Sequence, residues 1–254
     1  MTAQKAARIA LHLAALGALL ALLAPSLALA QSISIDLGTS GSAGTTARLV
    51  QLTALVTALS MAPSLLVMVT AFTRIIIVLS LLRSALGAQG VPPNIVLIGL
   101  ALFLTFHVMQ PVLEQSWSAG FLPMTEGRIE SLEGLTQAAE PFRRFMLANL
   151  REDDLRLFLD LAHLPEPATP EATPWRALIP GFLISEMRRA FEIGFLIYLP
   201  FLVIDLVVAS ILMSLGMMML PPNAISLPFK LIFFVLLDGW RLVSGSIVQS
   251  FVVG

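Results

Sequence analysis

Charged side chains interrupt long apolar stretches of this sequence, and they are the residues whose types suggest chemistry. Arg74 lies in the first such stretch, Asp205 in the third, and Lys230 and Asp238 in the fourth. At bilayer depth such groups are normally paired or turned toward protein or an aqueous cavity. They fit structural ion pairs at subunit contacts, a proton-coupled transport site, or two aspartates sharing a proton as in an aspartyl protease. Basic neighbours, Lys230 and Arg241, favour structural pairing.

Three consecutive methionines, Met217, Met218 and Met219, form the second unusual feature. Gly216 precedes them and the pair Pro221 and Pro222 follows, so they lie at a turn between two apolar stretches. Methionine is unbranched and polarizable, which lets several side chains close around irregular or changing shapes. The pattern predicts either a soft plug or a turn that only packs within the membrane, and the residues alone leave both interpretations open.

Other chemistry finds little support. The sequence has no P-loop, no His-Glu-x-x-His, no Gly-x-Ser-x-Gly and no dinucleotide-binding glycine motif. It has no cysteine, which excludes disulfides, thiolate catalysis and cysteine-ligated metals. His107 has no second ligand at metal-binding spacing and is predicted to be a hydrogen-bonded core residue. We therefore expect a protein that is not an enzyme, with no cofactor and no metal.

Composition places these residues in a membrane protein. Hydrophobic residues make up 57% of the 254 and charged residues only 12%, with a mean hydropathy of +0.89. Those values are too apolar for an ordinary soluble domain. The net charge is -1, and the one clear basic cluster, Lys5 and Arg8, lies at the extreme N-terminus, so the chain has no electrostatic surface for nucleic acid.

Residues 1–30 have the form of a cleaved signal peptide. Lys5 and Arg8 precede an apolar stretch, Pro25 follows it, and Ala28 and Ala30 provide small residues at the cleavage site. The alternative is an uncleaved first membrane helix, although the stretch is short for a span of about 20 residues. Cleavage would place the mature N-terminus outside the cytoplasm.

The rest of the chain is predicted to be all-α, with kinked helical hairpins on either side of a polar segment. A polar N-terminal segment covers 31–48, a first hairpin 49–113, a polar helical excursion 114–177 and a second hairpin 178–254. Segment 114–177, which holds eleven acidic residues, is predicted to be periplasmic. Within it, Pro141 is predicted to open one helix and Glu152 a second, because acids favour a helix N-terminus.

The charges and prolines within the apolar stretches also predict that these helices pack against other protein segments. Pro180, Pro200 and Pro228 are expected to kink or break their helices, and broken helices at membrane depth need other segments to satisfy the freed backbone groups. A single chain offers few such segments, so the pattern indicates an oligomer.

Ordered blocks of residues extend across most of the chain and carry a resemblance. They are Phe72 to Val78, Leu81 to Arg83, Pro92 to Asn94, Leu100 to Phe106, Ser185 to Glu186, Phe191 to Phe195, Pro200 to Asp205, Gly216 to Pro222, Leu227 to Lys230 and Leu237 to Trp240. With these blocks the chain resembles the FliP family of flagellar type III export-gate proteins. The related SctR injectisome proteins share much of the pattern without a signal peptide, so residues 1–30 favour the flagellar branch.

The resemblance implies a function. Several copies would form a multi-subunit ring with the Q and R export-gate proteins in the inner membrane, at the flagellar basal body. Unfolded flagellar proteins would cross through its pore, which Met217, Met218 and Met219 would line as a gasket. Glu186 belongs to one of the shared blocks and is grouped with Arg74, Asp205, Lys230 and Asp238 as a structural or inter-subunit charge. An injectisome subunit and a proton-coupled transporter are the alternatives.

Overall fold

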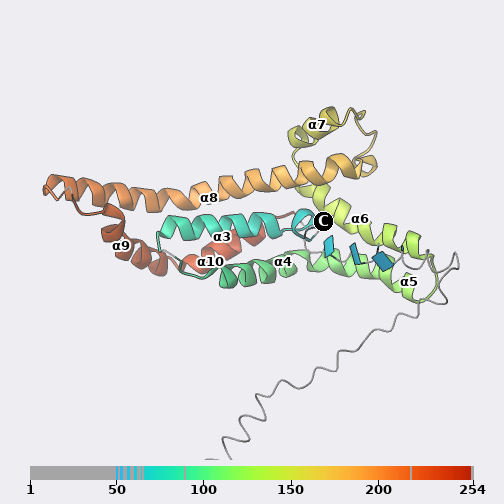
Figure 1. Ribbon diagram of the computed structural model, residues 1–254, viewed down its shortest axis with the longest axis horizontal. Helices are drawn as coiled ribbons and strands as arrows, with labels where there is room; N and C mark the ends of the chain where they lie inside the picture. Colours follow the sequence, from blue (N-terminus) through green and yellow to red (C-terminus); the bar gives the residue numbers. More distant parts are fainter. Residues whose placement is uncertain are drawn as a thin grey trace, which may run out of the picture. The chain divides into compact units, whose positions relative to one another are not determined.

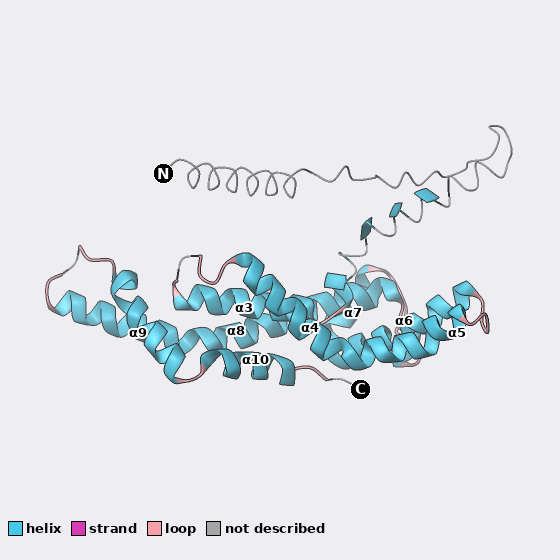
Figure 2. Cartoon of the chain, turned by 90° about the horizontal axis from the view of Figure 1, so that it is seen from below, coloured by secondary structure: helices cyan, strands magenta, loops and turns pink. Residues whose placement is uncertain are grey.

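The computed structural model describes residues 66–88, 90–217 and 219–252, together with isolated positions between 50 and 64. The predicted signal peptide and polar segment, residues 1–48, lie outside this part of the chain. Two units divide the chain, residues 1–58 and 59–254. The helices from Phe72 onward all belong to the second unit, and the described residues contain no strand (Figure 2). The all-α prediction is therefore confirmed.

Eight α-helices and two short helices follow one another in the described part of the second unit from Phe72 onward. They are α3 (Phe72–Leu86), α4 (Asn94–Ser116), the π-helix η1 (Trp117–Phe121), α5 (Leu122–Thr125), α6 (Ser131–Asn149), α7 (Glu152–Leu161), the 3-10 helix η2 (Pro170–Ala172), α8 (Trp175–Ser214), α9 (Pro222–Leu236) and α10 (Gly239–Gln249). Helix α3 packs along α8 on one side and against α4 on the other (Figure 1). The short α7 also packs on α8, and the connection between α8 and α9 lies at the opposite end of the unit from α5 (Figure 1).

Two helices in the described part of the chain are long and apolar enough to cross a membrane. One runs continuously from Asn94 to Thr125, and the other is the 40-residue α8. At 1.5 Å per residue α8 is about 60 Å long, roughly twice the hydrocarbon thickness of a bilayer. Helices α9 and α10 together would make a third span, with a bend of 65° between them.

The predicted proline breaks are absent from these helices. Helix α8 continues through Pro180 and Pro200, and α9 continues through Pro228. An internal proline removes only one backbone hydrogen bond, and long helices packed on neighbours can retain their path past it. The sharp bend lies instead at Asp238, which has φ 50° and ψ 50° between α9 and α10. Aspartate is one of the few residues besides glycine that adopt this left-handed conformation.

Two helix starts were predicted in segment 114–177, and the structure confirms one and contradicts the other. Helix α7 begins at Glu152 with three acids in its first turn, as predicted. Helix α6, however, begins at Ser131, ten residues before Pro141, which lies inside it. The extra turns are held by tertiary contact, because Ser116 Oγ donates a 2.8 Å hydrogen bond to the Ala138 carbonyl across the two helices.

Helix α6 approaches η1 so closely that only glycine fits between them. A Cβ atom on Gly120 would lie 2.4 Å from the Gly134 carbonyl oxygen and 2.5 Å from the Ala138 backbone nitrogen. Those atoms belong to backbone, so the contact could be relieved only if one helix moved.

Gly120→Ala is therefore expected to destabilise the protein by about 1–3 kcal/mol, the usual cost of overpacking. A thermal melt of the detergent-purified chain would measure the loss. Gly99→Ala in α4 is the matched control, because its new methyl group would meet nothing within 4 Å. It is expected to be neutral or stabilising by about 0.5–1 kcal/mol, since glycine disfavours a helix interior. Equal melting of the two variants would contradict the close contact.

Candidate functional site

The methionine loop, residues 215–222, begins with a well-defined helix end. Helix α8 closes in a Schellman motif, in which Met217 N–H donates to the Leu212 carbonyl at 3.0 Å and Gly216 N–H donates to the Met213 carbonyl at 3.1 Å. Gly216 has φ +71°, a conformation that side-chain-bearing residues rarely adopt. The backbone thus turns away from the α8 axis at a fixed point.

The other end of the loop is fixed by its prolines. Pro221 is the N-cap of α9 and Pro222 its first residue, where a missing N–H costs nothing. Between the two ends the described apolar side chains, Met217, Met219 and Leu220, are outside the core. Met219 is 98% exposed and Met217 46% exposed, while Met218 lies outside the described residues. The loop therefore presents methionine side chains from a backbone held at both ends.

A lysine cluster, Lys230, Asp205 and Ser226, joins the two helices that carry this loop. Lys230 Nζ lies 2.6 Å from Asp205 Oδ2 and donates a 3.0 Å hydrogen bond to the Ala85 carbonyl. The Ser226 hydroxyl donates to Asp205 Oδ1 at 2.5 Å. Ala85 lies in the last turn of α3, where backbone carbonyls lack intrahelical partners and favour a cation. One ammonium group thus connects α9 to α8 and to the end of α3.

An arginine cluster, Arg74, Glu186, Asn149 and Ser250, lies far along α8 from the loop. Arg74 and Glu186 are both fully buried and form a bidentate pair, with Arg74 Nε 2.9 Å from Glu186 Oε2. Arg74 Nη1, the terminal nitrogen that does not contact Glu186, donates to the Ser250 carbonyl at 2.7 Å and to the Ser250 hydroxyl at 3.0 Å. Helices α3 and α8 are thereby joined to the residues that follow α10.

Further contacts complete the arginine cluster. The side chain of Asn149, at the end of α6, accepts from Arg74 at 3.4 Å and exchanges two hydrogen bonds with the Val252 backbone. The guanidinium of Arg74 also stacks on Phe251, 3.8 Å from the ring centre. Of the described buried side-chain polar atoms, none lacks a hydrogen-bond partner. The buried charge of Arg74 is thus compensated by groups from three parts of the chain: α6, α8 and the residues that follow α10.

Asp238 differs from the other predicted charges. It is exposed at the bend between α9 and α10, and its carboxylate does not cap α10. Neither Asp238 nor the exposed Arg241 belongs to any ion pair in the described part of the chain. The structure therefore brings Asp205 to Lys230 and Arg74 to Glu186, but leaves Asp238 apart from both clusters.

The sequence reasoning missed several polar residues of this framework. Asp154 accepts hydrogen bonds from the Ser185 hydroxyl at 2.8 Å and from Arg188 at 3.0 Å, and so attaches α7 to α8. Arg83 contacts the Asn94 side chain across the connection from α3 to α4. Asp154 stood out only as an acid at a helix start, while Arg83 and Asn94 lie in two of the family blocks, which could have indicated them.

The prediction for His107 was wrong. Its side chain is exposed on α4 beside the exposed Phe106, rather than hydrogen-bonded in a core. The apolar residues around it in sequence face different sides of the helix, and the next two, Val108 and Met109, turn inward. Across the described residues no group of three or more His, Cys, Asp or Glu could hold a metal ion.

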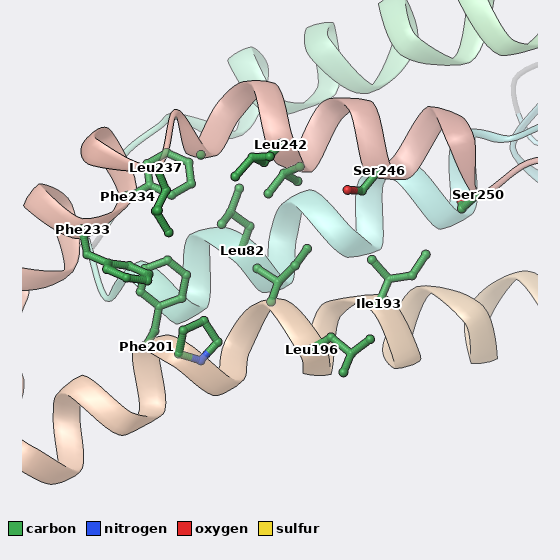
Figure 3. A pocket seen from close by; sticks show the side chains of 14 residues that line it. Leu82, Ile193, Leu196, Phe201, Phe233, Phe234, Leu237, Leu242, Ser246 and Ser250 are labelled. Atoms are coloured by element: carbon green, nitrogen blue, oxygen red, sulfur yellow. The ribbon is translucent and has the colours of Figure 1, made fainter.

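An apolar cavity of about 400 Å³ lies beside α8 and reaches Ser250 of the arginine cluster (Figure 3). It is bounded by α3, α8, α9 and α10, with Phe201, Phe233 and Phe234 near one end and Ser246 and Ser250 near the other. Among the described residues that line it, these two serines alone have polar side chains. The same lining residues include no nucleophile with a base and no pair of carboxylates.

Comparison with known proteins decides the family. The sequence model of the FliP family matches residues 55–247. The chain belongs to the FliP family. It is 56% identical over 237 residues to the flagellar biosynthetic protein FliP of Caulobacter vibrioides, covering 93% of this chain and 88% of that relative. It is 50% identical over 202 residues to the FliP of Bacillus subtilis, covering 80% of this chain and 91% of the relative.

Membership in the FliP family settles the class of function. The chain is a component of the flagellar export apparatus of the inner membrane, and FliP proteins are not enzymes. The aspartyl-protease and solute-transporter interpretations of Asp205, Lys230 and Asp238 are therefore set aside. The flagellar branch of the resemblance is confirmed, since the FliP of Agrobacterium fabrum also matches, at 48% identity over 89% of this chain and 94% of the relative.

Proposed function

We propose that several copies of this chain assemble with the Q and R export-gate proteins into a ring, and that the methionine loops of the copies close its pore. Unfolded flagellar proteins would pass through this pore across the inner membrane, with segment 114–177 on the periplasmic side. The chain carries no nucleotide-binding motif, so the energy for transport comes from partner proteins and the proton motive force.

The observation that carries the proposal is the exposure of methionine on a backbone fixed at both ends. Met219 is 98% exposed at a turn set by Gly216 and two prolines. A flexible, apolar side chain on a firm support can yield to a passing chain and return. Apolar constrictions oppose ion passage by dewetting.

One loop encloses nothing, so the seal requires other copies. The surfaces beside the loop are also suited to partners, because α8 and α9 expose large apolar side chains there, among them Ile211, Met213 and Phe229. Asp238 is exposed and unpaired among the described ion pairs, and we assign it to a contact between subunits. The lysine cluster, which joins α8, α9 and the end of α3, holds each copy's loop at a defined position.

Deletion of Met217 to Met219 is the experiment that tests the gate. The altered chain would be co-purified with the Q and R proteins, reconstituted into vesicles and assayed for ion leakage. We expect leakage several-fold above that of the unaltered complex, because removing the apolar side chains lets water and ions enter the constriction.

The control substitutes exposed residues away from the loop. Leu132→Ala and Leu135→Ala in α6 remove comparable apolar groups from exposed positions and are expected to leave leakage unchanged. Unchanged conductance in the deleted complex, with normal subunit composition, would contradict the gate while leaving the family assignment intact.

A further inference from the structure

We propose that the methionine loop is a site of reversible oxidation by hydroperoxides, and that its oxidation makes the closed gate conduct ions. The sequence motivates the idea. It contains 11 methionines and no cysteine, so no thiol of this chain competes for an oxidant. Its thioethers are then the most readily oxidised side chains it offers.

The loop holds Met219, the most exposed methionine of the described part of the chain, although Met61, Met68 and Met187 outside the loop are also 37–55% exposed. Met219 is 98% exposed, and Met213 and Met217 within six residues of it are 60% and 46% exposed. Met109 and Met146, by contrast, are 1% and 0% exposed in the helical core. Oxidation of a side chain follows its access to solvent. The chain therefore presents reactive sulfur at one end of α8 and protects these two core sulfurs.

The chemistry is a two-electron oxygen transfer. A lone pair of the methionine sulfur attacks one oxygen of hydrogen peroxide, the O–O bond breaks, and an S–O bond forms. The proton of the transferred oxygen passes to the departing hydroxide, which leaves as water. Sulfur is oxidised from thioether to sulfoxide and the peroxide is reduced. Methionine sulfoxide reductases reverse the step with two thiols, which become a disulfide as the oxygen leaves as water.

The consequence for the gate rests on the proposed function. A sulfoxide converts a flexible apolar side chain into a polar, hydrogen-bond-accepting one. In a constriction that excludes ions by staying dry, such groups hold water and remove the barrier. Because the loop backbone is held by Gly216 and Pro221 at its two ends, oxidation would alter the lining of the pore without unfolding its support.

The first measurement maps the modification. The purified complex in detergent is treated with hydrogen peroxide, and each methionine peptide is followed by mass spectrometry. We expect Met219 and Met217 to gain oxygen at least about tenfold faster than Met109 and Met146. Loop methionines that oxidise no faster than these two buried residues would overturn the proposal.

The second measurement follows ion leakage of the complex in vesicles before peroxide, after it, and after methionine sulfoxide reductases with dithiothreitol. We expect leakage to rise several-fold and to return after reduction. The triple variant Met217→Leu, Met218→Leu and Met219→Leu keeps the loop apolar but removes its thioethers, and its leakage is expected not to respond to peroxide.

The outcomes separate this proposal from the gate itself. If the loop oxidises but leakage stays constant, while deletion of Met217 to Met219 raises leakage, the oxidation proposal is wrong and the gate stands. If the leucine variant responds to peroxide as the unaltered complex does, the effect comes from other residues and the proposal is likewise wrong. If deletion has no effect on leakage, the gate itself is refuted.

Discussion

Arg74→Ala is expected to destabilise the chain by about 3–5 kcal/mol, because it leaves the carboxylate of Glu186 buried without its partner. Both side chains are fully buried, and Arg74 also donates to Ser250 and stacks on Phe251. The loss should appear as a lower melting temperature of the detergent-purified protein and a reduced yield of the assembled complex. Few single substitutions in this chain should cost as much.

A double variant distinguishes the charge from the packing. Arg74→Met with Glu186→Leu removes both charges, and replacing a buried ion pair with apolar residues is often neutral or stabilising. We expect it to recover most of the stability that Arg74→Ala loses. Arg156→Ala is the surface control, since its ion pairs with Glu152 and Glu166 are both exposed, each at 3.7 Å, and it should change stability by less than about 1 kcal/mol. A double variant as unstable as Arg74→Ala would show that the loss comes from shape rather than charge.

Lys230→Met is expected to have the second-largest effect, about 1.5–3 kcal/mol, the usual value for hydrogen bonds to a charged group. The substitution leaves the Asp205 carboxylate without its cation and the Ala85 carbonyl, at the end of α3, without its donor. Because Lys230 joins α9 to α3, the methionine loop should lose its fixed position. Assembly yield and ion leakage in vesicles would both report the change.

Two comparisons sharpen the Lys230 result. Arg241→Met removes an exposed cation from the same region, one that forms no ion pair among the described residues, and should leave yield and leakage unaltered. Asp205→Asn keeps one acceptor oxygen, which can face Lys230 while its NH2 group donates to the Ser226 hydroxyl oxygen, and it should cost less than Lys230→Met. Normal assembly combined with lost export in either Lys230→Met or Asp205→Asn would instead indicate a proton relay at this pair.

Local signals in the sequence were enough for much of the fold. The acids at Glu152 correctly placed the start of α7, because a helix N-terminus interacts with residues in its own first turn. Gly216 and the two prolines placed the loop between α8 and α9, since both residue types restrict the backbone where they stand. Prolines misled the same reasoning about where helices end, because Pro141 lies inside α6 and α8 continues through Pro180 and Pro200.

The sequence by itself determined that this is an all-helical membrane protein of the FliP class, that it has no motif for catalysis, and that methionines occupy one turn. Each conclusion rests on composition or on residues close together in the chain. Only the tertiary structure decided which charges pair, because Arg74 meets Glu186 across 112 residues and Ser250 across 176. The tertiary structure also decided that Asp238 lies outside the described ion pairs and that the side chains of His107 and Met219 are exposed. The burial of a side chain depends on which helices pack around it.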